Sequence, residues 1–493
     1  MLNNKIIIAS LGGLLAGLSL LEMNFILMIF ALVLLWEVSI APRLSFVWGF
    51  IAVLVGYRWL LDLHPLDWMG IPNLASLFVS NSILLLCSAF GGILVFTWSR
   101  ILIFIYQILN SRIDKDIYEY PSFIIFMSSL WGLSEVWLSH SPFFWIGVGG
   151  SLLPGDVWLA GLARVFGEGG LVVIQLLIGW WIWRLINLLD NLLLFRKLIF
   201  RGFLIILLAH IFGYCLLNFD MQGTRVPVAV LQPAIPVRDK FSGDMQLKAK
   251  SLLKTSLARA RDSGASFLIA PEGFILPNQN LTELNTIPLL SGGFRYVEDE
   301  LRSSLLVFEK EELNFSSAID KHRLVPLGEF LPEIPGLQFS GLSLVGGLNP
   351  GDSDRLLEWS GPPMAVAICY ELSDGNAIAK SVNDGAKWIL SIANLDPYTK
   401  SLHDQFLALA QLRSIETGRD LIISANTGPS SLILSNGSIA SNLNSYEEGF
   451  GLFDLELKDI ITPYVLWREI PLLILIALTS IRLNYISRTK ISS

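Results

Sequence analysis

Charged residues and cysteines are both scarce in this sequence of 493 residues. Asp, Glu, Lys and Arg make up 16% of it, against roughly a quarter in a soluble globular chain, which excludes a chain that is soluble throughout. Three cysteines are too few for a disulfide scaffold. The net charge of −7 argues against nucleic-acid binding, which needs a clustered excess of Lys and Arg. Aromatic residues make up 11%, so the chain is not of low complexity.

The apolar residues are concentrated in the first 219 positions and in a final run that starts near Pro463. Twelve of the fifteen tryptophans precede residue 220, several of them at the ends of apolar runs, where the ring favours the membrane interface. A helix needs about 20 apolar residues to cross the hydrocarbon core of a bilayer. Residues 101–109 either extend the fourth apolar run or lie along the interface. The sequence predicts eight spans, at about 5–21, 23–40, 44–61, 74–97, 121–139, 168–189, 198–217 and 464–481.

The distribution of Lys and Arg over the loops predicts the orientation of these spans, because cytoplasmic loops are enriched in both. The outside loop 62–73 has neither residue, and the outside loop 140–167 has only Arg164. Seven spans then place residues 220–462 outside, and the eighth returns the tail to the cytoplasm. With the N-terminus inside, every inside segment is basic, through Arg43, then Arg100, Arg112 and Lys115, then Arg196, Lys197 and Arg201, and finally Arg482, Arg488 and Lys490.

Two segments of the membrane half have more than one interpretation. The first apolar run lacks a small-residue cleavage site close behind it, so we interpret it as a retained anchor rather than a removed signal peptide. The long loop 140–167 contains the apolar run SPFFW and many glycines. It is either a re-entrant segment that only packs or part of a site through which lipid reaches the outer domain.

Residues 220–462 change to the pattern of a soluble protein. Strands alternate with helices in an order typical of a layered α/β domain. About 240 residues are enough for one large core. The predicted strands are 225–231, 266–270, 364–368, 388–392 and 421–424, and the predicted helices are 245–262 and 402–416. The sequence therefore predicts a transmembrane part at 1–219, an α/β domain at 220–462 and a last span with its tail at 463–493.

Three places in the α/β domain carry residues suited to chemistry, each at the end of a predicted strand. Glu272 follows the strand 266–270 and is either a general base or a surface acid. Lys321 and Glu329 stand in a loop fixed by prolines and a glycine, where an ammonium group can stabilise an oxyanion or merely be solvated. Cys369 follows the strand 364–368 and has no partner cysteine in its domain, so it is either a core residue or a nucleophile. His322 and His403 are interpreted as structural, and no metal-ligand cluster, Walker loop or dinucleotide fingerprint is present.

Taken together, the order Glu272, Lys321, Cys369 resembles the nitrilase superfamily, whose catalytic triad runs Glu-Lys-Cys. The phrase LVPLGEFLP at 324–332 is similar to one branch of that superfamily. With seven spans before the domain and one after it, the whole chain resembles the apolipoprotein N-acyltransferase family. The block RSIETGRDLIISANTG at 413–428 and the region of Asn394 also resemble that family.

The resemblance implies a fold and a set of roles. The fold class is a multi-span α-helical membrane domain with an exocytoplasmic nitrilase-like domain, an α-β-β-α sandwich. The implied catalytic residues are Glu272 as base, Lys321 with the Tyr370 backbone N–H as oxyanion donors, and Cys369 as nucleophile. Glu329 is implied as a supporting residue that orients Lys321 or assists proton transfer, and Glu371 either shapes the site or is a surface or structural acid. Neither a cofactor nor a metal is expected.

The resemblance also implies a substrate pair, a membrane phospholipid as acyl donor and a diacylated lipoprotein as acceptor. The acyl chain would pass through a thioester on Cys369 to the α-amino group of the lipid-modified N-terminal cysteine. The protein would be a monomer in the bacterial inner membrane, with its catalytic domain on the periplasmic side. Two alternatives stay open: a membrane-anchored nitrilase-type amidase with a soluble substrate, and a membrane protein whose outer domain only binds a partner.

The sequence departs from the family pattern near the triad. Ala270 stands where an aromatic residue is usual, and Ile319 stands where a tyrosine is frequent. Arg302 lies about where an asparagine is expected, and the stretch from 274 to 321 is short. These departures leave the triad intact but affect the expected shape of the acyl-chain pocket. Gating loops are predicted at 275–320 or 333–362 from their Gly, Pro and Ser content.

Overall fold

The computed structural model describes residues 2–66, 71–110, 117–141, 145–219, 222–240, 242–277, 281, 285–325, 329 and 347–489. They form two compact units. The helical unit comprises Met1–Leu61, Phe78–Asn218 and Trp467–Ser493, and the α/β unit comprises Asp62–Leu77 and Phe219–Leu466. Several positions singled out above lie outside the described residues, namely Arg112, Lys115, 142–144, 326–328, 330–346 and Lys490.

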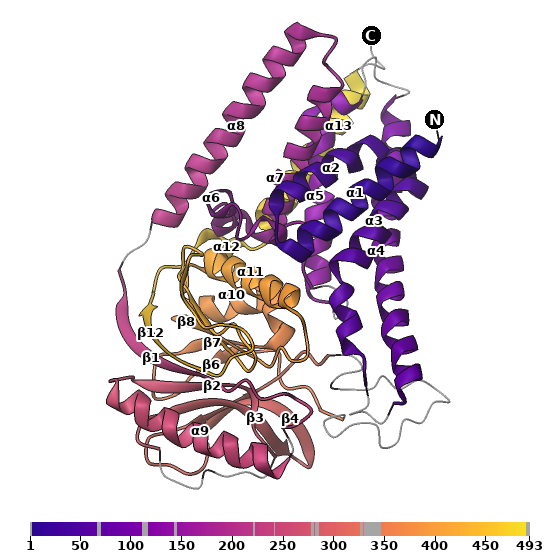
Figure 1. The fold of residues 1–493 in the computed structure, drawn as a ribbon. Helices are drawn as coiled ribbons and strands as arrows, with labels where there is room; N and C mark the ends of the chain where they lie inside the picture. The colour runs from indigo at the N-terminus through magenta and orange to yellow at the C-terminus, as the bar shows by residue number, and fades with distance from the viewer. Residues whose placement is uncertain are drawn as a thin grey trace. The chain divides into compact units, whose positions relative to one another are not determined.

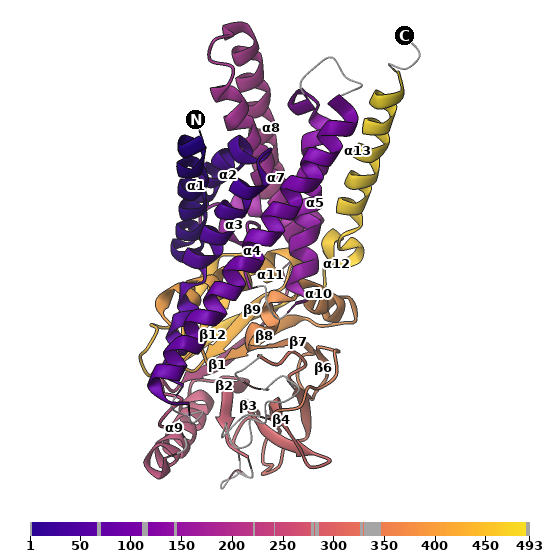
Figure 2. The same ribbon diagram turned by 90° about the vertical axis from the view of Figure 1, so that its right-hand side faces the viewer.

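Helices form at each of the eight apolar runs predicted from the sequence. Pro42 and Pro121 occupy first-turn positions of α3 and α5, where a missing N–H costs nothing. Glycines of α1 let it approach α3 closely, since a Cβ on Gly17 would collide with Val55. The helices are α1 (Leu2–Glu22), α2 (Phe25–Val38), α3 (Pro42–Gly56), α4 (Asn73–Asn110), α5 (Pro121–Ser139), α7 (Ala163–Ile186), α8 (Leu192–Asn218) and α13 (Ile470–Thr489). In the helical unit, α13 runs along α5 (Figure 2).

Five helices of the described residues are long and apolar enough to cross a bilayer. Four of them precede residue 220, and the chain is therefore a multi-span membrane protein. The helices α2 and α3 are apolar but shorter, with 14 and 15 residues. Eight crossings and the resulting orientation stay a prediction. The five are Asn4–Glu22, Asn73–Leu109, Pro121–Ser139, Ala163–Ile186 and Ile470–Ser487.

Two questions left open by the sequence have structural answers in the helical unit. Residues 101–109 extend the fourth run, so that α4 is one helix of 38 residues, roughly 57 Å long at 1.5 Å per residue.

The described part of the loop 140–167 folds inward. The main chain of this loop donates hydrogen bonds to both carboxylate oxygens of Glu135, from Val148 N at 3.0 Å and from Gly149 N at 3.2 Å. Buried main-chain groups need such partners, so these hydrogen bonds allow Val148 and Gly149 to pack inside the unit. That the loop takes part in lipid access stays a prediction.

The α/β unit contains two six-stranded sheets packed face to face (Figure 1). The first has the order β12-β1-β2-β3-β4-β5 and the second the order β11-β10-β9-β8-β7-β6. The first sheet comprises β1 (Thr224–Gln232), β2 (Phe267–Ile275), β3 (Leu289–Val297), β4 (Glu300–Phe308), β5 (Ser317–Asp320) and β12 (Gly449–Leu457). The second comprises β6 (Leu356–Leu357), β7 (Met364–Ile368), β8 (Trp388–Ala393), β9 (Leu421–Ala425), β10 (Ser431–Ile433) and β11 (Ile439–Asn442).

Helices cover the outer faces of both sheets and complete an α-β-β-α sandwich (Figure 1). The helix α9 (Gly243–Asp262) covers the first sheet, and α10 (Gly375–Asn383) and α11 (Lys400–Thr417) cover the second. The inner faces share one apolar core, which includes Val228 and Ile269 from the first sheet and Val366 and Ile392 from the second. The predicted fold class is confirmed in its two parts, a multi-span helical unit and a layered α/β domain.

The prediction of a gating loop at 275–320 is wrong for most of that segment. Strands β3, β4 and β5 occupy 289–297, 300–308 and 317–320, in the interior and at the edge of the first sheet. Their Gly and Ser residues take part in the strand pairing of the sheet. At Gly292 a glycine is needed, because a Cβ there would collide with the backbone of Glu272. The other candidate, 333–362, lies outside the described residues up to position 346.

Candidate active site

Cys369 stands at a sharp turn immediately after the buried strand β7. Its backbone has φ = 57°, a left-handed conformation that costs free energy for any residue other than glycine. The main chain turns there into the short helix Cys369–Ser373, and the backbone N–H of Tyr370 lowers the pKa of the Cys369 thiol. Such strain in a non-glycine residue is typical of functional sites.

Lys321 connects two carboxylates in the interior of the α/β unit. Its side chain is 1% exposed, and its Nζ lies 2.8 Å from Glu272 Oε1 and 2.6 Å from Glu329 Oε1. The remaining oxygens are also engaged, since Glu272 Oε2 accepts a hydrogen bond from Asn394 N at 3.1 Å and Glu329 Oε2 accepts one from Val325 N at 2.9 Å. The three charges therefore form one hydrogen-bonded group fixed to the main chain.

These three charged groups act directly on the thiol of Cys369. Burial raises the pKa of Cys369, and the negative charges of Glu272 and Glu329 raise it further, whereas Lys321 lowers it. Burial alone would lower the pKa of Lys321, but the attraction of Glu272 and Glu329 outweighs it, so that its pKa lies well above the usual value. The thiol therefore needs a base to remove its proton, and Lys321 stays a cation.

Lys321 follows a strand that is held by a second ion-pair network. Asp320 accepts two parallel hydrogen bonds from Arg295, at 2.6 and 2.8 Å, and one from Ser304 Oγ at 2.7 Å. Arg302, one of the departures from the family pattern, adds a longer contact of 3.3 Å. Although burial raises the pKa of Asp320, its hydrogen bonds with Arg295 and Ser304 hold that pKa below the usual value. The network fixes the backbone next to Lys321.

Glu371 joins the loop of Lys321 to the turn of Cys369. Its Oε1 accepts hydrogen bonds from His322 N at 2.7 Å and Arg323 N at 3.0 Å, and its Oε2 accepts one from Ile368 N at 2.9 Å. Arg355, which is 3% exposed, forms an ion pair with the same carboxylate at 3.2 Å. Glu371 thus lies beside the site and connects the backbone that follows Lys321 to the backbone that precedes Cys369.

The other predicted residues occupy supporting positions. The hydroxyl of Tyr370 donates to Leu324 O at 3.0 Å, and the guanidinium of Arg323 lies over its ring at 4.9 Å from the centroid. His322 Nδ1 lies 2.9 Å from Gly351 O, and His403 Nε2 lies 3.3 Å from Leu395 O. No group of three His, Cys, Asp or Glu side chains suited to a metal ion occurs among the residues that the structure describes.

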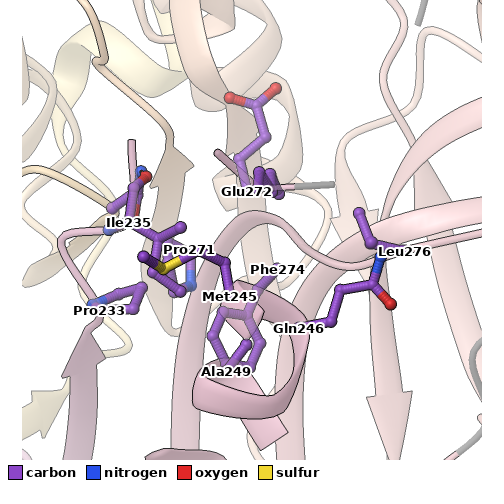
Figure 3. A pocket seen from close by; sticks show the side chains of 11 residues that line it. Pro233, Ile235, Met245, Gln246, Ala249, Pro271, Glu272, Phe274 and Leu276 are labelled. Carbon is purple, nitrogen blue, oxygen red and sulfur yellow. The ribbon is translucent and has the colours of Figure 1, made fainter. Parts of the chain in front are cut away.

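A small pocket borders Glu272, which lies within β2 and not after its end, because the strand continues to Ile275. Figure 3 shows Met245, Ala249 and Phe274 on one side of it and Glu272 on the opposite side. Its lining also includes the side chain of Lys240, which no sequence pattern singles out. Sequence reasoning also missed Arg295 and Arg355, which pair with Asp320 and Glu371 from distant segments, so no local spacing marks them. Asn426, which lines the same pocket, lies within the block 413–428 but was not singled out there.

Comparison with known proteins yields consistent relatives over almost the whole chain. The chain is 48% identical over 485 residues to the "Apolipoprotein N-acyltransferase" of Prochlorococcus marinus strain MIT 9313, covering 98% of this chain and 97% of the relative. Proteins of the same name from Prochlorococcus marinus strain SARG and Parasynechococcus marenigrum strain WH8102 are 47% and 42% identical, covering 98% and 92% of this chain and 96% of each relative. No protein-family profile matches the chain.

Solved structures of the nitrilase superfamily resemble part of the chain. Saccharomyces cerevisiae Nit3 has 16% sequence identity and a TM-score of 0.37, covering 48% of this chain and 91% of its own. A mutant of the Nesterenkonia AN1 amidase from the same superfamily has 16% identity and a TM-score of 0.38, covering 52% of this chain and 98% of its own.

Proposed function

The chain belongs to the apolipoprotein N-acyltransferase family, and we propose that it moves a fatty acyl chain from a membrane phospholipid to the α-amino group of a diacylated lipoprotein. The observation that carries the proposal is the contact of one buried ammonium, Lys321, with the two carboxylates Glu272 and Glu329 beside Cys369. This arrangement suits acyl transfer because it supplies a nucleophile, a base and a cation for the developing negative charge.

In the first half-reaction, Glu272 takes the thiol proton while the sulfur of Cys369 attacks the ester carbonyl of the phospholipid. The carbon–sulfur bond forms, and the carbonyl oxygen becomes an oxyanion. Lys321 Nζ and the Tyr370 backbone N–H are the donors for that oxyanion, and removing one such donor typically costs about 10²–10³ in rate. When the intermediate collapses, the ester carbon–oxygen bond breaks. The lysophospholipid leaves with the proton from Glu272, and the acyl chain stays on Cys369 as a thioester.

In the second half-reaction, the α-amino group of the lipoprotein attacks the thioester. Glu272 accepts a proton from the amine as the carbon–nitrogen bond forms, and the carbon–sulfur bond then breaks. The thiolate of Cys369 regains the proton from Glu272, and the amide product leaves. Glu329 holds Lys321 in place through both steps, because it shares the ammonium group with Glu272 at 2.6 Å.

The membrane part supports amphiphilic substrates rather than a small soluble amide. Several spanning helices are unnecessary for hydrolysis of a soluble molecule, whereas a donor and an acceptor that both carry acyl chains diffuse within the bilayer. The basic residues of the loops favour a catalytic unit on the periplasmic side of the bacterial inner membrane. We propose that the protein acts there as a monomer, without a cofactor.

A two-stage labelling experiment tests this function. Purified full-length protein in detergent is mixed with a phospholipid whose acyl chain is isotopically labelled. We expect one acyl chain on the peptide that contains Cys369, removable by neutral hydroxylamine and missing in Cys369→Ala. Adding a diacylated lipopeptide should then yield a triacylated product. Free fatty acid in place of that product favours the amidase alternative, and the lack of any adduct contradicts the proposal.

A further inference from the structure

Asn426 stands directly after β9, and its side chain connects the ends of strands from both sheets. The residue is buried, with 5% of its surface exposed. Its Oδ1 accepts a hydrogen bond from Ile235 N at 3.0 Å, and its Nδ2 donates to Ile235 O at 2.6 Å and to Asn394 Oδ1 at 2.7 Å. Ile235 follows β1 of the first sheet, and Asn394 follows β8 of the second. The N–H and C=O of Ile235 allow only one orientation of the Asn426 amide, so the side chain is fixed.

The peptide group that joins Ala393 to Asn394 lies between Asn426 and the candidate base Glu272. Its carbonyl accepts a hydrogen bond from Asn426 N at 3.0 Å, and its N–H donates one to Glu272 Oε2 at 3.1 Å. Asn426 therefore holds this turn twice, through the carbonyl of Ala393 and through the side chain of Asn394. Because the peptide group is planar, fixing its carbonyl also fixes the direction in which its N–H points.

This N–H determines how the carboxylate of Glu272 is turned. The other oxygen, Oε1, contacts Lys321 Nζ at 2.8 Å, and the same ammonium group also contacts Glu329 at 2.6 Å. A contact at one oxygen leaves the second oxygen free to turn, so the hydrogen bond from Asn394 N sets the plane of the carboxylate. Proton transfer from Cys369 depends on that plane, since small displacements of reacting groups cost as much as ~10² in rate.

A second buried amide, Gln232 at the end of β1, separates a merely structural role from a role in the site. Its Oε1 accepts a hydrogen bond from Ser430 N at 2.9 Å, and its Nε2 donates to Asn444 O at 2.6 Å and Glu447 O at 2.8 Å. Like Asn426, it thus makes three hydrogen bonds to distant segments of the same unit. Within the part of the chain that the structure describes, none of these partners donates to Glu272.

We propose that Asn426 is a positioning residue of this site, which orients the Ala393–Asn394 peptide group and thereby the Glu272 carboxylate that takes the Cys369 proton. The inference rests on the proposed role of Glu272 as base. Without the Asn426 side chain, Glu272 keeps its charge and its contact with Lys321, but its second oxygen is free to turn away from the thiol. The expected defect is therefore in the rate of the chemical step and not in substrate binding.

The test measures thioester formation on Cys369 in the full-length protein in detergent, with an excess of phospholipid whose acyl chain is isotopically labelled. We expect Asn426→Leu to lower the maximal rate by roughly tenfold, with the half-saturating phospholipid concentration nearly unchanged. Glu272→Gln should lower the rate further. Adding Asn426→Leu to Glu272→Gln should cause no additional loss, because the two changes act through the same carboxylate. An additional loss in the double variant overturns the proposal.

The matched control is Gln232→Met, which also replaces a buried amide by an apolar side chain of similar size. It should lower the melting temperature about as much as Asn426→Leu does, while the maximal rate stays within about twofold of the unaltered protein. An equal loss of rate in both variants overturns the proposal. If Asn426→Leu does not fold, Asn394→Ala removes only the acceptor of Asn426 Nδ2 and should lower the maximal rate by about threefold; an unchanged rate there overturns the proposal.

Two further outcomes have distinct meanings. Asn426 also lines the pocket beside Glu272. A raised half-saturating phospholipid concentration with an unchanged maximal rate in Asn426→Leu overturns the positioning role, because Asn426 would then bind the substrate. A lack of any thioester in the unaltered protein contradicts the proposed function itself, and the positioning role with it. A thioester that forms equally fast in the unaltered protein and in Asn426→Leu overturns the positioning role alone.

Discussion

Two buried carboxylates next to the same loop differ in how completely their oxygens are occupied. Glu371 accepts hydrogen bonds from three main-chain N–H groups and pairs with Arg355. Glu272 accepts one main-chain hydrogen bond and shares Lys321 with Glu329. A carboxylate held by three main-chain N–H groups and an arginine is fixed in place and connects the segments that donate to it. One that shares its cation and lies beside a thiol is suited to proton transfer.

The largest effects are expected at the nucleophile and the shared cation. Cys369→Ser should lower acyl transfer by ~10³-fold or more, because a hydroxyl is a much weaker nucleophile than a thiolate. Lys321→Met should lower it by about 10²–10³-fold and also destabilise the protein, since two carboxylates are left facing each other. Transfer to a diacylated lipopeptide and melting in detergent measure both. Ordinary transfer by either variant would contradict the assigned roles.

The comparison itself is tested by replacing each carboxylate with its amide. Glu272→Gln should abolish most transfer with a small change in melting temperature, because the amide still accepts from Lys321. Glu371→Gln should lower the melting temperature by several degrees, since the buried Arg355 loses its counter-charge, at a cost of about 3–5 kcal/mol. Activity and thermal unfolding of both variants are measured in parallel. Equal losses of stability would show that the two carboxylates do not differ as described.

A smaller effect is expected from the network behind Lys321. Arg295→Met removes the two parallel hydrogen bonds to Asp320 and should lower kcat by about tenfold with KM nearly unchanged, because only the position of Lys321 is affected. Arg302→Met is the matched control, since its contact with Asp320 is longer, 3.3 Å, and it also pairs with Glu300. Steady-state kinetics give kcat and KM for both variants. A loss of kcat in Arg302→Met that equals or exceeds the loss in Arg295→Met would contradict the prediction that Arg295 matters more.

The smallest effect concerns Asp420, a buried carboxylate held by two main-chain N–H groups, those of Ser435 and Glu456. Burial raises its pKa to about 6. A raised folded-state pKa means that ionisation costs stability, so its contribution is complete at acid pH and is lost as the pH rises through 6. The melting temperature of Asp420→Asn relative to the unaltered protein should therefore rise between pH 4.5 and 8, by up to a few degrees. A constant or falling difference would contradict this.

The sequence predicted the elements with strong periodicity and missed those with mixed composition. The apolar runs became helices, and the buried parallel strands β7, β8 and β9 lie where the runs MAVAI, WILSI and LIIS predict them. The strands β3 and β4 were missed, because LLSGGFRYV and ELRSSLLVF mix Gly, Ser and Arg with apolar residues. Their pairing depends on the rest of the sheet rather than on local pattern.

The site was predictable in part from buried strands. The strand before Cys369 was predicted as it is, whereas Glu272 lies within β2, beyond the predicted end of that strand, and the short strand β5 before Lys321 was not predicted. Lys321 was located through its loop and through the order Glu272, Lys321, Cys369. The structure brings all three together, while their roles stay a prediction. The partners Arg295 and Arg355 could not be located. Each contacts a residue that is distant in the sequence and becomes a neighbour only when the protein folds. Arg295 and Asp320, for example, lie on different strands of one sheet.

The α/β unit includes a segment from the first quarter of the chain, Asp62–Leu77. Asp62 accepts a hydrogen bond from Thr399 N, and Pro65 O accepts one from Arg238, both at 3.3 Å. A fragment expressed from residue 220 onward would thus lack two hydrogen-bond acceptors, the one for Thr399 N and the one for the Arg238 side chain. Anyone who truncates the gene to obtain a water-soluble fragment should graft this segment onto it, or keep the full-length chain.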